Sequence, residues 1–322
     1  MQSRRLGKSD LMLSAIGFGG GPVGWSTAQD ADEVAEAALQ AAWTLGCRYF
    51  DTAPYYGFGQ SERRIGRFLR HKPRADFALS STVGRLILPA HASDHSPSQV
   101  RFDYSRDGAL RSIEESLLRL GLDRIDIALI HDIDGWTHAD EKPRRFAEAL
   151  DGAYRALCDL KSQGVIRAIG LGVNEWRVCL DFAKQVPVDC FLLAGRVTLL
   201  EHEAEEVLLP YCAAGSIGVI AGGPFNSGIL ASGAVDGAVY NYAPARETIL
   251  ARVRRLESIC LSYAIPLAAA ALAFPLRFPA VASVIPGMAN AAEAAMSATN
   301  AAIEIPDALW RELEREWQMR DQ

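Results

Sequence analysis

The chain has little lysine, no basic stripe and no long apolar run. Only five lysines stand among its 33 basic residues, and 39 acidic residues give a formal charge of −6. Because no basic patch or lysine-rich run is present, we expect no nucleic-acid partner and no binding to anionic membranes. The most apolar late stretch, residues 266–274, is far too short to span a bilayer. These absences exclude the nucleic-acid-binding and membrane-embedded classes of protein.

The six cysteines form no C-x-x-C pair and no metal-ligand pattern. Each lies in an apolar stretch, where a thiol behaves as a small hydrophobic group, so we expect buried, reduced cysteines and no metal site. The start, MQSRRLGKSDLMLSAIGFGG, contains no cleavable apolar segment of the kind that directs secretion. The sequence therefore predicts a cytoplasmic protein without a disulfide framework.

Short β-rich runs alternate with helical segments along the whole chain. With 49% hydrophobic and 22% charged residues, the composition is that of an ordinary globular protein. Several β-rich runs are continuously apolar, as expected for parallel strands covered on both faces. The eight expected strands are residues 13–17, 48–52, 77–82, 125–131, 168–173, 190–194, 218–222 and 282–285. The expected helices are residues 32–44, 61–69, 107–120, 144–162, 175–184, 203–213, 246–263 and 267–276, with a last helix over residues 306–318.

This alternation predicts an α/β fold. Eight strands joined by helical crossovers close into a (β/α)8 TIM barrel, here with a short N-terminal β-hairpin and a C-terminal helix, as a single domain over residues 1–322. The alternative, an open doubly wound sheet, needs a glycine-rich fingerprint that runs straight into a helix. The run GFGGGPVG at residues 17–24 is rich in glycine, but no helix is expected directly after it. The barrel is therefore the preferred interpretation.

Three long connections follow strand ends on one face of the expected barrel. They cover residues 84–106, 132–143 and 223–244. Enzymes of this fold build their substrate pockets from such loops at the carboxyl ends of the strands. We expect the aromatic side chains of Trp25 and Tyr55, and of Trp136 in the second long connection, to contact a substrate.

Three polar side chains stand at or just after strand ends on that same face. Asp51 ends the second strand in YFDTAPYYG, Tyr56 follows it by five residues, and His131 ends the fourth strand in IALIHDID. A tyrosine hydroxyl exchanges a proton with a carbonyl or alcohol oxygen when its pKa is lowered. A neutral imidazole orients such an oxygen or moves a proton, and a buried carboxylate needs a partner. Their convergence on one rim predicts an active site.

These residues, in this order, resemble the aldo-keto reductase family. The similarity runs through DTAPYYG, GQSERRIG, EESLLRLGLDRIDIALIH, LKSQGVIRAIGLGVNEW and GPFNSGIL, and it is closest to bacterial aldose dehydrogenases of the L-fucose, D-galactose and D-threo-aldose type. The resemblance implies a barrel enzyme that moves a hydride between NAD or NADP and a carbonyl or alcohol. It makes Tyr56 the proton donor or acceptor, with Asp51 and His131 beside it.

One position departs from the family pattern in a way that changes the chemistry. The family reads like STKVGR after the third strand, whereas residues 80–85 of this chain read SSTVGR, with Thr82 in place of the catalytic lysine. An ammonium group beside Tyr56 would favour the phenolate and would neutralise Asp51, and both effects are lost with threonine. Thr82 is either a natural feature of this protein or a substitution introduced to disable it.

The resemblance also implies residues that hold a dinucleotide. Small residues in the GPFNSGIL loop would let backbone N–H groups approach the pyrophosphate, and Asn174 matches the position that binds the carboxamide. The expected cofactor-binding residues are Asn174, Gly223, Pro224, Phe225, Asn226, Ser227, Gly228, Leu230, Gly287 and Asn290. Val197 replaces an aromatic residue of the family, and residues 285–294 contain no basic group for a 2′-phosphate. We therefore favour NAD over NADP, and a protein that uses neither remains open.

Three functions follow from these patterns. The first is an oxidoreductase acting on a sugar or a small polar aldehyde or alcohol. The second is a lyase, dehydratase or isomerase that uses Asp51, Tyr56 and His131 for acid–base work without hydride transfer. The third is a non-catalytic regulatory protein that binds a dinucleotide. In each case we expect a small-molecule ligand, with a sugar-like substrate for the first, and a monomer or homodimer.

Overall fold

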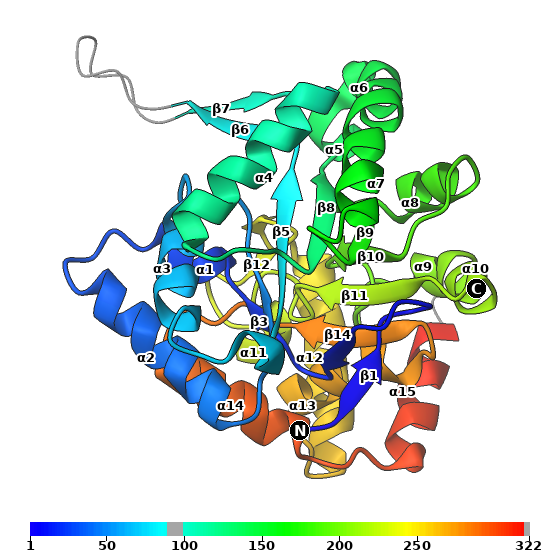
Figure 1. Cartoon of the computed structure of the whole chain (residues 1–322). Helices are drawn as coiled ribbons and strands as arrows, with labels where there is room; N and C mark the ends of the chain where they lie inside the picture. The colour runs from blue at the N-terminus through cyan, green and yellow to red at the C-terminus, as the bar shows by residue number, and fades with distance from the viewer. Residues whose placement is uncertain (89–98, 319–322) are drawn as a thin grey trace.

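The computed structural model describes residues 1–88 and 99–318, and its centre is one sheet of eight parallel strands (Figure 1). The strands lie in the order β14-β11-β10-β9-β8-β5-β4-β3. Their bounds are β3 Phe18–Gly19, β4 Tyr49–Asp51, β5 Ala78–Val83, β8 Ile127–His131, β9 Ala168–Val173, β10 Cys190–Ala194, β11 Gly218–Gly222 and β14 Val281–Ile285. The (β/α)8 barrel predicted from the sequence is confirmed.

The barrel closes where its first and last strands meet, and we call this junction the seam. Isolated parallel bridges join Ile16 to Val284 and Gly19 to Gly287. The amide of Gly17 donates to the carbonyl of Val284 at 2.9 Å. Central strands such as β10 and β11 pair over five residues, from Cys190–Gly218 to Ala194–Gly222, so the seam is more sparsely bonded than the middle of the sheet.

The prediction for the first strand was wrong. Residues 13–17 do not form a barrel strand, because the chain pairs β1 (Ser3–Arg5) with β2 (Met12–Ser14) in an antiparallel hairpin. Leu13, with which the predicted strand began, instead belongs with Leu6 and Leu11 to the buried cluster that includes Ile127 and Leu129 of the barrel interior. The hairpin therefore closes one end of the barrel, as expected for the N-terminal hairpin, and leaves the other end open for a site.

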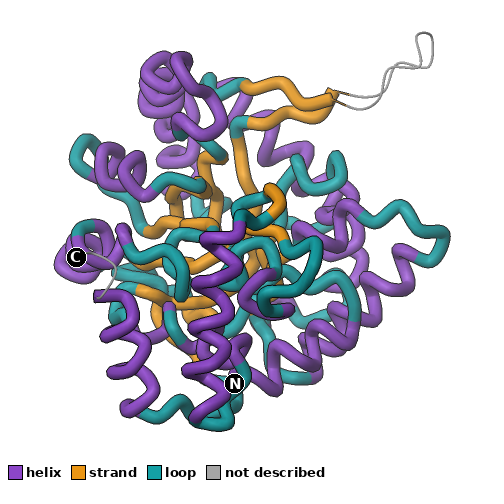
Figure 2. Tube along the Cα trace, turned by 180° about the vertical axis from the view of Figure 1, so that it is seen from behind, coloured by secondary structure: helices purple, strands orange, loops and turns teal. Residues whose placement is uncertain are grey.

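Helices surround the strands, as Figure 2 shows from behind. The larger ones are α2 Ala31–Thr44, α3 Gln60–Leu69, α4 Arg106–Leu120, α6 Lys142–Glu148, α7 Tyr154–Ser162, α8 Trp176–Ala183, α10 Leu208–Gly215, α12 Glu247–Ser262, α13 Leu267–Ala273, α14 Ala291–Ala301 and α15 Asp307–Gln318. Short helical turns are α1 Gly21–Trp25, η1 Arg74–Asp76, α5 Gly135–His138, η2 Ala139–Glu141, η3 Ala149–Ala153, α9 Glu203–Glu206, α11 Ile229–Ser232 and η4 Pro275–Arg277. The last helix lies where the sequence predicted it.

The helix expected over residues 144–162 is interrupted by a π-helical turn, η3. At this turn the amide of Ala153 donates to the carbonyl of Tyr104 at 2.8 Å. A side-chain carbon on Gly152 would lie 2.5 Å from that same carbonyl oxygen, so only glycine allows the approach. The π-turn thus brings the helix against the chain that leads into α4 (Figure 1).

The three long connections contain structure of their own. The hairpin of β6 (Arg85–Leu88) and β7 (Gln99–Phe102) projects away from the barrel in Figure 1, and residues 89–98 of the predicted connection lie outside the described residues. The second connection forms α5 and η2, and the third contains α11 and the small hairpin of β12 (Val239–Tyr240) with β13 (Ala243–Pro244). The glycine-rich run at residues 17–24 contains the five-residue helix α1, and the next helix begins at Ala31.

Within the described residues, no single helix is long and apolar enough to cross a membrane. One pair passes the same test only when taken together, namely Glu247–Ser262 with Leu267–Arg277, and that pair is bent by 96°.

Candidate active site

A cavity of about 600 Å³ opens at the carboxyl ends of the barrel strands. Its size is typical of sites that take a small molecule. The structure brings together here all the residues predicted for catalysis and for substrate contact, together with one predicted for the cofactor. These are Trp25, Asp51, Tyr55, Tyr56, Thr82, His131, Trp136 and Asn174.

Asp51 ends β4 and is buried. The hydroxyl of Ser80 donates to its Oδ1 at 2.5 Å, and the same hydroxyl lies 2.8 Å from the hydroxyl of Tyr49. Among residues 1–88 and 99–318, no cation pairs with this carboxylate. Burial without a cation raises the pKa of Asp51 to about 7, although the Ser80 hydrogen bond opposes the shift.

This raised pKa makes protein stability depend on pH. An aspartate has a pKa of about 3.9 in an unfolded chain, so the folded state binds this proton more tightly. The contribution to stability is complete below pH 4 and is lost as the pH rises through about 7. Between pH 4 and pH 7, the unaltered protein should therefore lose more unfolding free energy than Asp51→Asn does. The difference should be on the order of 3–4 kcal/mol. Urea unfolding of both proteins at several pH values measures this, and parallel curves would contradict it.

Tyr56 follows β4 and stands edge-on to the imidazole of His131, with ring centroids 6.2 Å apart and an interplanar angle of 89°. Burial raises the pKa of the Tyr56 hydroxyl well above its ordinary value, and the negative charges of Asp51 and Asp132 add to the shift. Arg85 opposes it. A phenol in this state is protonated at neutral pH and gives up its proton less readily than an ordinary tyrosine.

His131 ends β8, and its Nδ1 lies 3.2 Å from the hydroxyl of Thr82. Its Nε2 lies 3.3 Å from Oδ2 of Asp132. The Thr82 contact suits a tautomer with the proton on Nε2, because the hydroxyl then donates to Nδ1. Burial and the nearby Arg85 guanidinium lower the pKa of His131 well below its ordinary value, so the ring is neutral at physiological pH.

Two charged residues of the cavity were missed by the sequence analysis. The guanidinium of Arg85 donates to the carboxylate of Asp132, and both side chains are buried. The same guanidinium lies over the ring of Tyr55, 4.3 Å from its centroid. Asp132 directly follows His131 in the chain. The only signal available was that adjacency.

Asn174 extends from the end of β9 into the same cavity. Its amide nitrogen Nδ2 donates to Oδ1 of Asp132 at 3.4 Å, and its Oδ1 accepts from the hydroxyl of Tyr242 at 3.5 Å. Asn174 therefore lies between the charged pair of the barrel mouth and the long connection that follows β11.

Four of the nine remaining residues predicted for a cofactor line a separate cavity of about 470 Å³. Phe225, Ser227, Gly228 and Gly287 line it. In the preceding loop, Asn226, Ser227 and Gly228 all have positive φ, at 44°, 62° and 104°. Within the described chain, the backbone N–H groups of Ser227 and Ile229 have no hydrogen-bond partner. Neighbouring free N–H groups of this kind form a concave site for an anion.

The other five predicted cofactor residues do not line this cavity. Pro224 and Leu230 are buried, and the side chain of Asn226 is hydrogen-bonded to Thr198 and to the carbonyl of Gly195. Asn290 caps α14 by accepting from the amide of Glu293 at 3.0 Å. Gly223 lies at the start of the loop with a φ of 58°.

All six cysteines are free thiols, and five of them are buried. In the described part of the chain, no group of three or more His, Cys, Asp or Glu side chains is placed to hold a metal ion. The polar chemistry at the barrel mouth therefore comes from the residues named above.

Comparison with known proteins identifies the class. The model of the Aldo/keto reductase family matches residues 15–317. The chain is 38% identical to pyridoxal 4-dehydrogenase of Microbacterium luteolum, over 98% of this chain and 97% of that protein. It is also 38% identical to D-threo-aldose 1-dehydrogenase of a Pseudomonas species, over 94% of each chain. Among solved structures, the holo form of aldo-keto reductase AKR11C1 from Bacillus halodurans superimposes with a TM-score of 0.75 at 23% identity, over 98% of this chain and 96% of that one.

The chain belongs to the aldo/keto reductase family. It is an oxidoreductase of the branch that contains the aldose dehydrogenases, as the sequence motifs predicted.

Proposed function

We propose that this enzyme transfers a hydride between a nicotinamide dinucleotide and a sugar or small polar aldehyde or alcohol. The observation that carries the proposal is the meeting of Asp51, Tyr56 and His131 in one cavity at the barrel mouth. Relatives that act on an aldose and on pyridoxal, two small hydroxylated aldehydes, support the class of substrate.

In this proposal, Tyr56 exchanges a proton with the substrate oxygen. His131, as a neutral imidazole, orients that oxygen through Nε2–H, and the Thr82 hydroxyl at Nδ1 favours this tautomer. Arg85 holds Asp132 in place, so the two buried charges compensate each other. Asn174 is the residue proposed to hold the carboxamide of the nicotinamide. The dinucleotide would supply or accept the hydride.

The residues around the second cavity fit a dinucleotide. The free N–H groups of Ser227 and Ile229 suit the pyrophosphate, and nothing lies within 4 Å of where a side-chain carbon on Gly228 would stand. Among the described residues, the charged side chains lining the cavity are Asp236 and Glu293, with no arginine or lysine. Because a negatively charged lining repels a 2′-phosphate, it supports NAD over NADP.

Mixing the protein with NAD and a panel of aldoses, and with pyridoxal, tests the proposal by the change in nicotinamide absorbance. Turnover of at least one of these substrates is the expected result. Failure to turn over any of them, together with failure to bind either nicotinamide cofactor in a calorimeter, would overturn it.

The charge at the second cavity predicts cofactor preference. A 2′-phosphate near Glu293 costs about 1–4 kcal/mol, so kcat/KM should be at least about tenfold higher with NAD than with NADP. Asn290→Arg should narrow this ratio, because it supplies a guanidinium for the phosphate. Asn290→Ala is the matched control, since it loses the same helix cap without adding charge. Equal ratios in both variants would show that charge at this position does not decide the preference.

A further inference from the structure

A cavity of about 440 Å³ adjoins the cavity at the barrel mouth. The two share Trp136 and Asn174 in their linings, so they lie side by side at the barrel mouth. The adjoining cavity is further lined by Trp176, Arg196 and Asn241, and by several carboxylates. None of its own residues takes part in the proposed transfer of hydride and proton.

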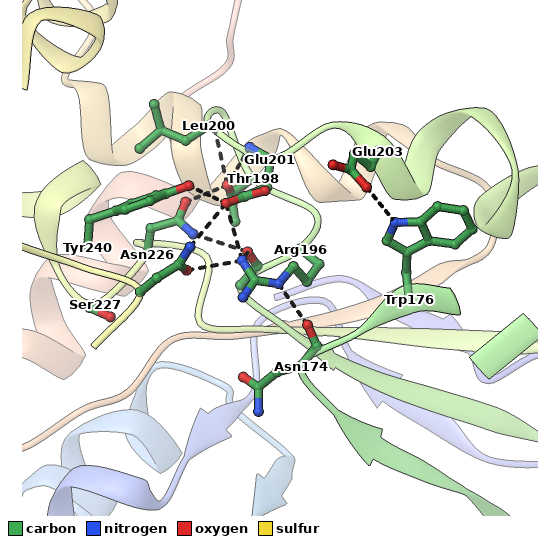
Figure 3. Close-up of polar contacts among 12 residues, drawn as sticks. Asn174, Trp176, Arg196, Thr198, Leu200, Glu201, Glu203, Asn226, Ser227 and Tyr240 are labelled. Atoms are coloured by element: carbon green, nitrogen blue, oxygen red, sulfur yellow. Dashed lines mark hydrogen bonds and ion pairs between the residues drawn. The ribbon is translucent and has the colours of Figure 1, made fainter. Parts of the chain in front are cut away.

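The floor of the adjoining cavity is a guanidinium held in a fixed position. Nε of Arg196 donates to the carbonyl of Asn174 at 2.7 Å, and Nη1 contacts Oδ1 of Asn241 at 3.0 Å and Oε1 of Glu201 at 3.2 Å. Figure 3 shows this guanidinium between Asn174 and Glu201. Among residues 1–88 and 99–318, no group accepts from Nη2 of Arg196. The cavity therefore holds a donor that is already oriented and has no acceptor.

Two indole rings line the same cavity. Trp136 is 54% exposed although it lies between two cavities, and the Arg196 guanidinium is 5.5 Å from the centre of its ring. Trp176 begins α8, and its indole N–H donates to Glu203 at 3.1 Å, which fixes the ring (Figure 3). Rigid aromatic surfaces beside fixed polar groups suit a ligand with apolar faces and polar edges.

The charge of the lining restricts the ligand further. Glu175, Glu201 and Glu203 oppose Arg177 and Arg196, so the carboxylates outnumber the guanidiniums. An anionic group such as a phosphate or carboxylate gains nothing overall from this lining. A neutral ring that carries hydroxyl groups offers an acceptor to Arg196, donors to the carboxylates and carbon–hydrogen faces to the indoles.

We propose that the adjoining cavity binds a second sugar ring, joined to the ring that reacts at Tyr56. The preferred substrate is then a reducing saccharide of two rings, in which the reacting carbon belongs to the first ring. This inference rests on the proposed function, and it adds to it a site for the part of the substrate that does not react.

The test compares reducing disaccharides with the monosaccharide that forms their reducing end. In the unaltered enzyme, kcat/KM should be at least about tenfold higher for a disaccharide of suitable linkage. Trp176→Ala should abolish this advantage and leave kcat/KM for the monosaccharide unchanged. Trp176→Phe, which keeps an aromatic face and loses the N–H, should retain part of it. Trp25→Ala is the matched control, because Trp25 lines only the first cavity and should affect both substrates alike.

Binding measured by calorimetry with the same sugars, without turnover, separates this inference from the proposed function. If the protein binds a disaccharide, Trp176→Ala weakens that binding and no nicotinamide is reduced, the second-ring site is supported. The same result rejects the proposed hydride transfer from these sugars. Oxidation of monosaccharides with no disaccharide advantage rejects the second-ring site alone. The site is also overturned if Trp176→Ala lowers kcat/KM equally for both sugars while circular dichroism shows a folded protein.

Discussion

Replacing Tyr56 by phenylalanine should lower kcat by about 10²–10⁴-fold, the usual contribution of a positioned acid or base. The hydroxyl is the only group removed, and the ring keeps its edge-on contact with His131. The loss should therefore fall on kcat, with little change in the affinity for either substrate. Steady-state kinetics with NAD and the best aldose measure both parameters.

Tyr55→Phe is the matched control for this substitution. Tyr55 lines the same cavity, and its ring packs against Arg85 and against Trp25. Removing its hydroxyl should change kcat by no more than a few-fold, because the ring contacts remain. If the two variants had equal activity, the proton would have to pass through another group, and the proposed role of Tyr56 would be wrong.

Introducing lysine at position 82 should raise kcat/KM by on the order of 10²-fold at neutral pH. An ammonium beside Tyr56 and Asp51 would favour the phenolate and the carboxylate, and it would oppose the burial that raises both pKa values. The rate should also reach its plateau at lower pH than in the unaltered enzyme. A pH–rate profile of each protein measures the shift.

Thr82→Met provides the control for chain length, because it fills similar space without a charge and removes the hydroxyl from His131. It should give no gain. If Thr82→Lys also gave none, the site would be adapted to work without a cation at this position, and acid–base chemistry without hydride transfer would become the better account of its residues. A large gain would indicate that hydride transfer in this chain is limited by the missing ammonium.

The sequence allowed seven of the eight barrel strands to be placed, because long apolar runs between helical segments leave little choice of period. The first strand was missed for a physical reason. Leu13 begins the predicted strand as an apolar residue, but it is buried beneath the barrel in a hairpin, and periodicity does not distinguish these two burial sites. The barrel strand β3 has only two residues, which is too short to give a pattern.

The residues that meet in the cavity could also be predicted, since the carboxyl ends of barrel strands converge on one face. The electrostatic arrangement could not. Arg85 and Asp132 are 47 positions apart and pair only because β5 and β8 are neighbours in the sheet. The contribution of Tyr242 to the cavity could not be predicted either. Tyr242 lies in the β12–β13 hairpin, whose position depends on tertiary contacts with Ser227 and Asn174.

The seam affects where the barrel opens locally. Gly287 both bridges to Gly19 across this junction and lines the cavity proposed for the dinucleotide. Local opening needs fewer broken backbone bonds at the seam than between β10 and β11, so the amides of Gly17 and Gly19 should exchange with solvent before those of β10 and β11. A ligand that rests on Gly287 would hold the last strand against the first. Ligand binding in the cofactor cavity should therefore stabilise the closed seam, and the closed seam should in turn favour ligand binding.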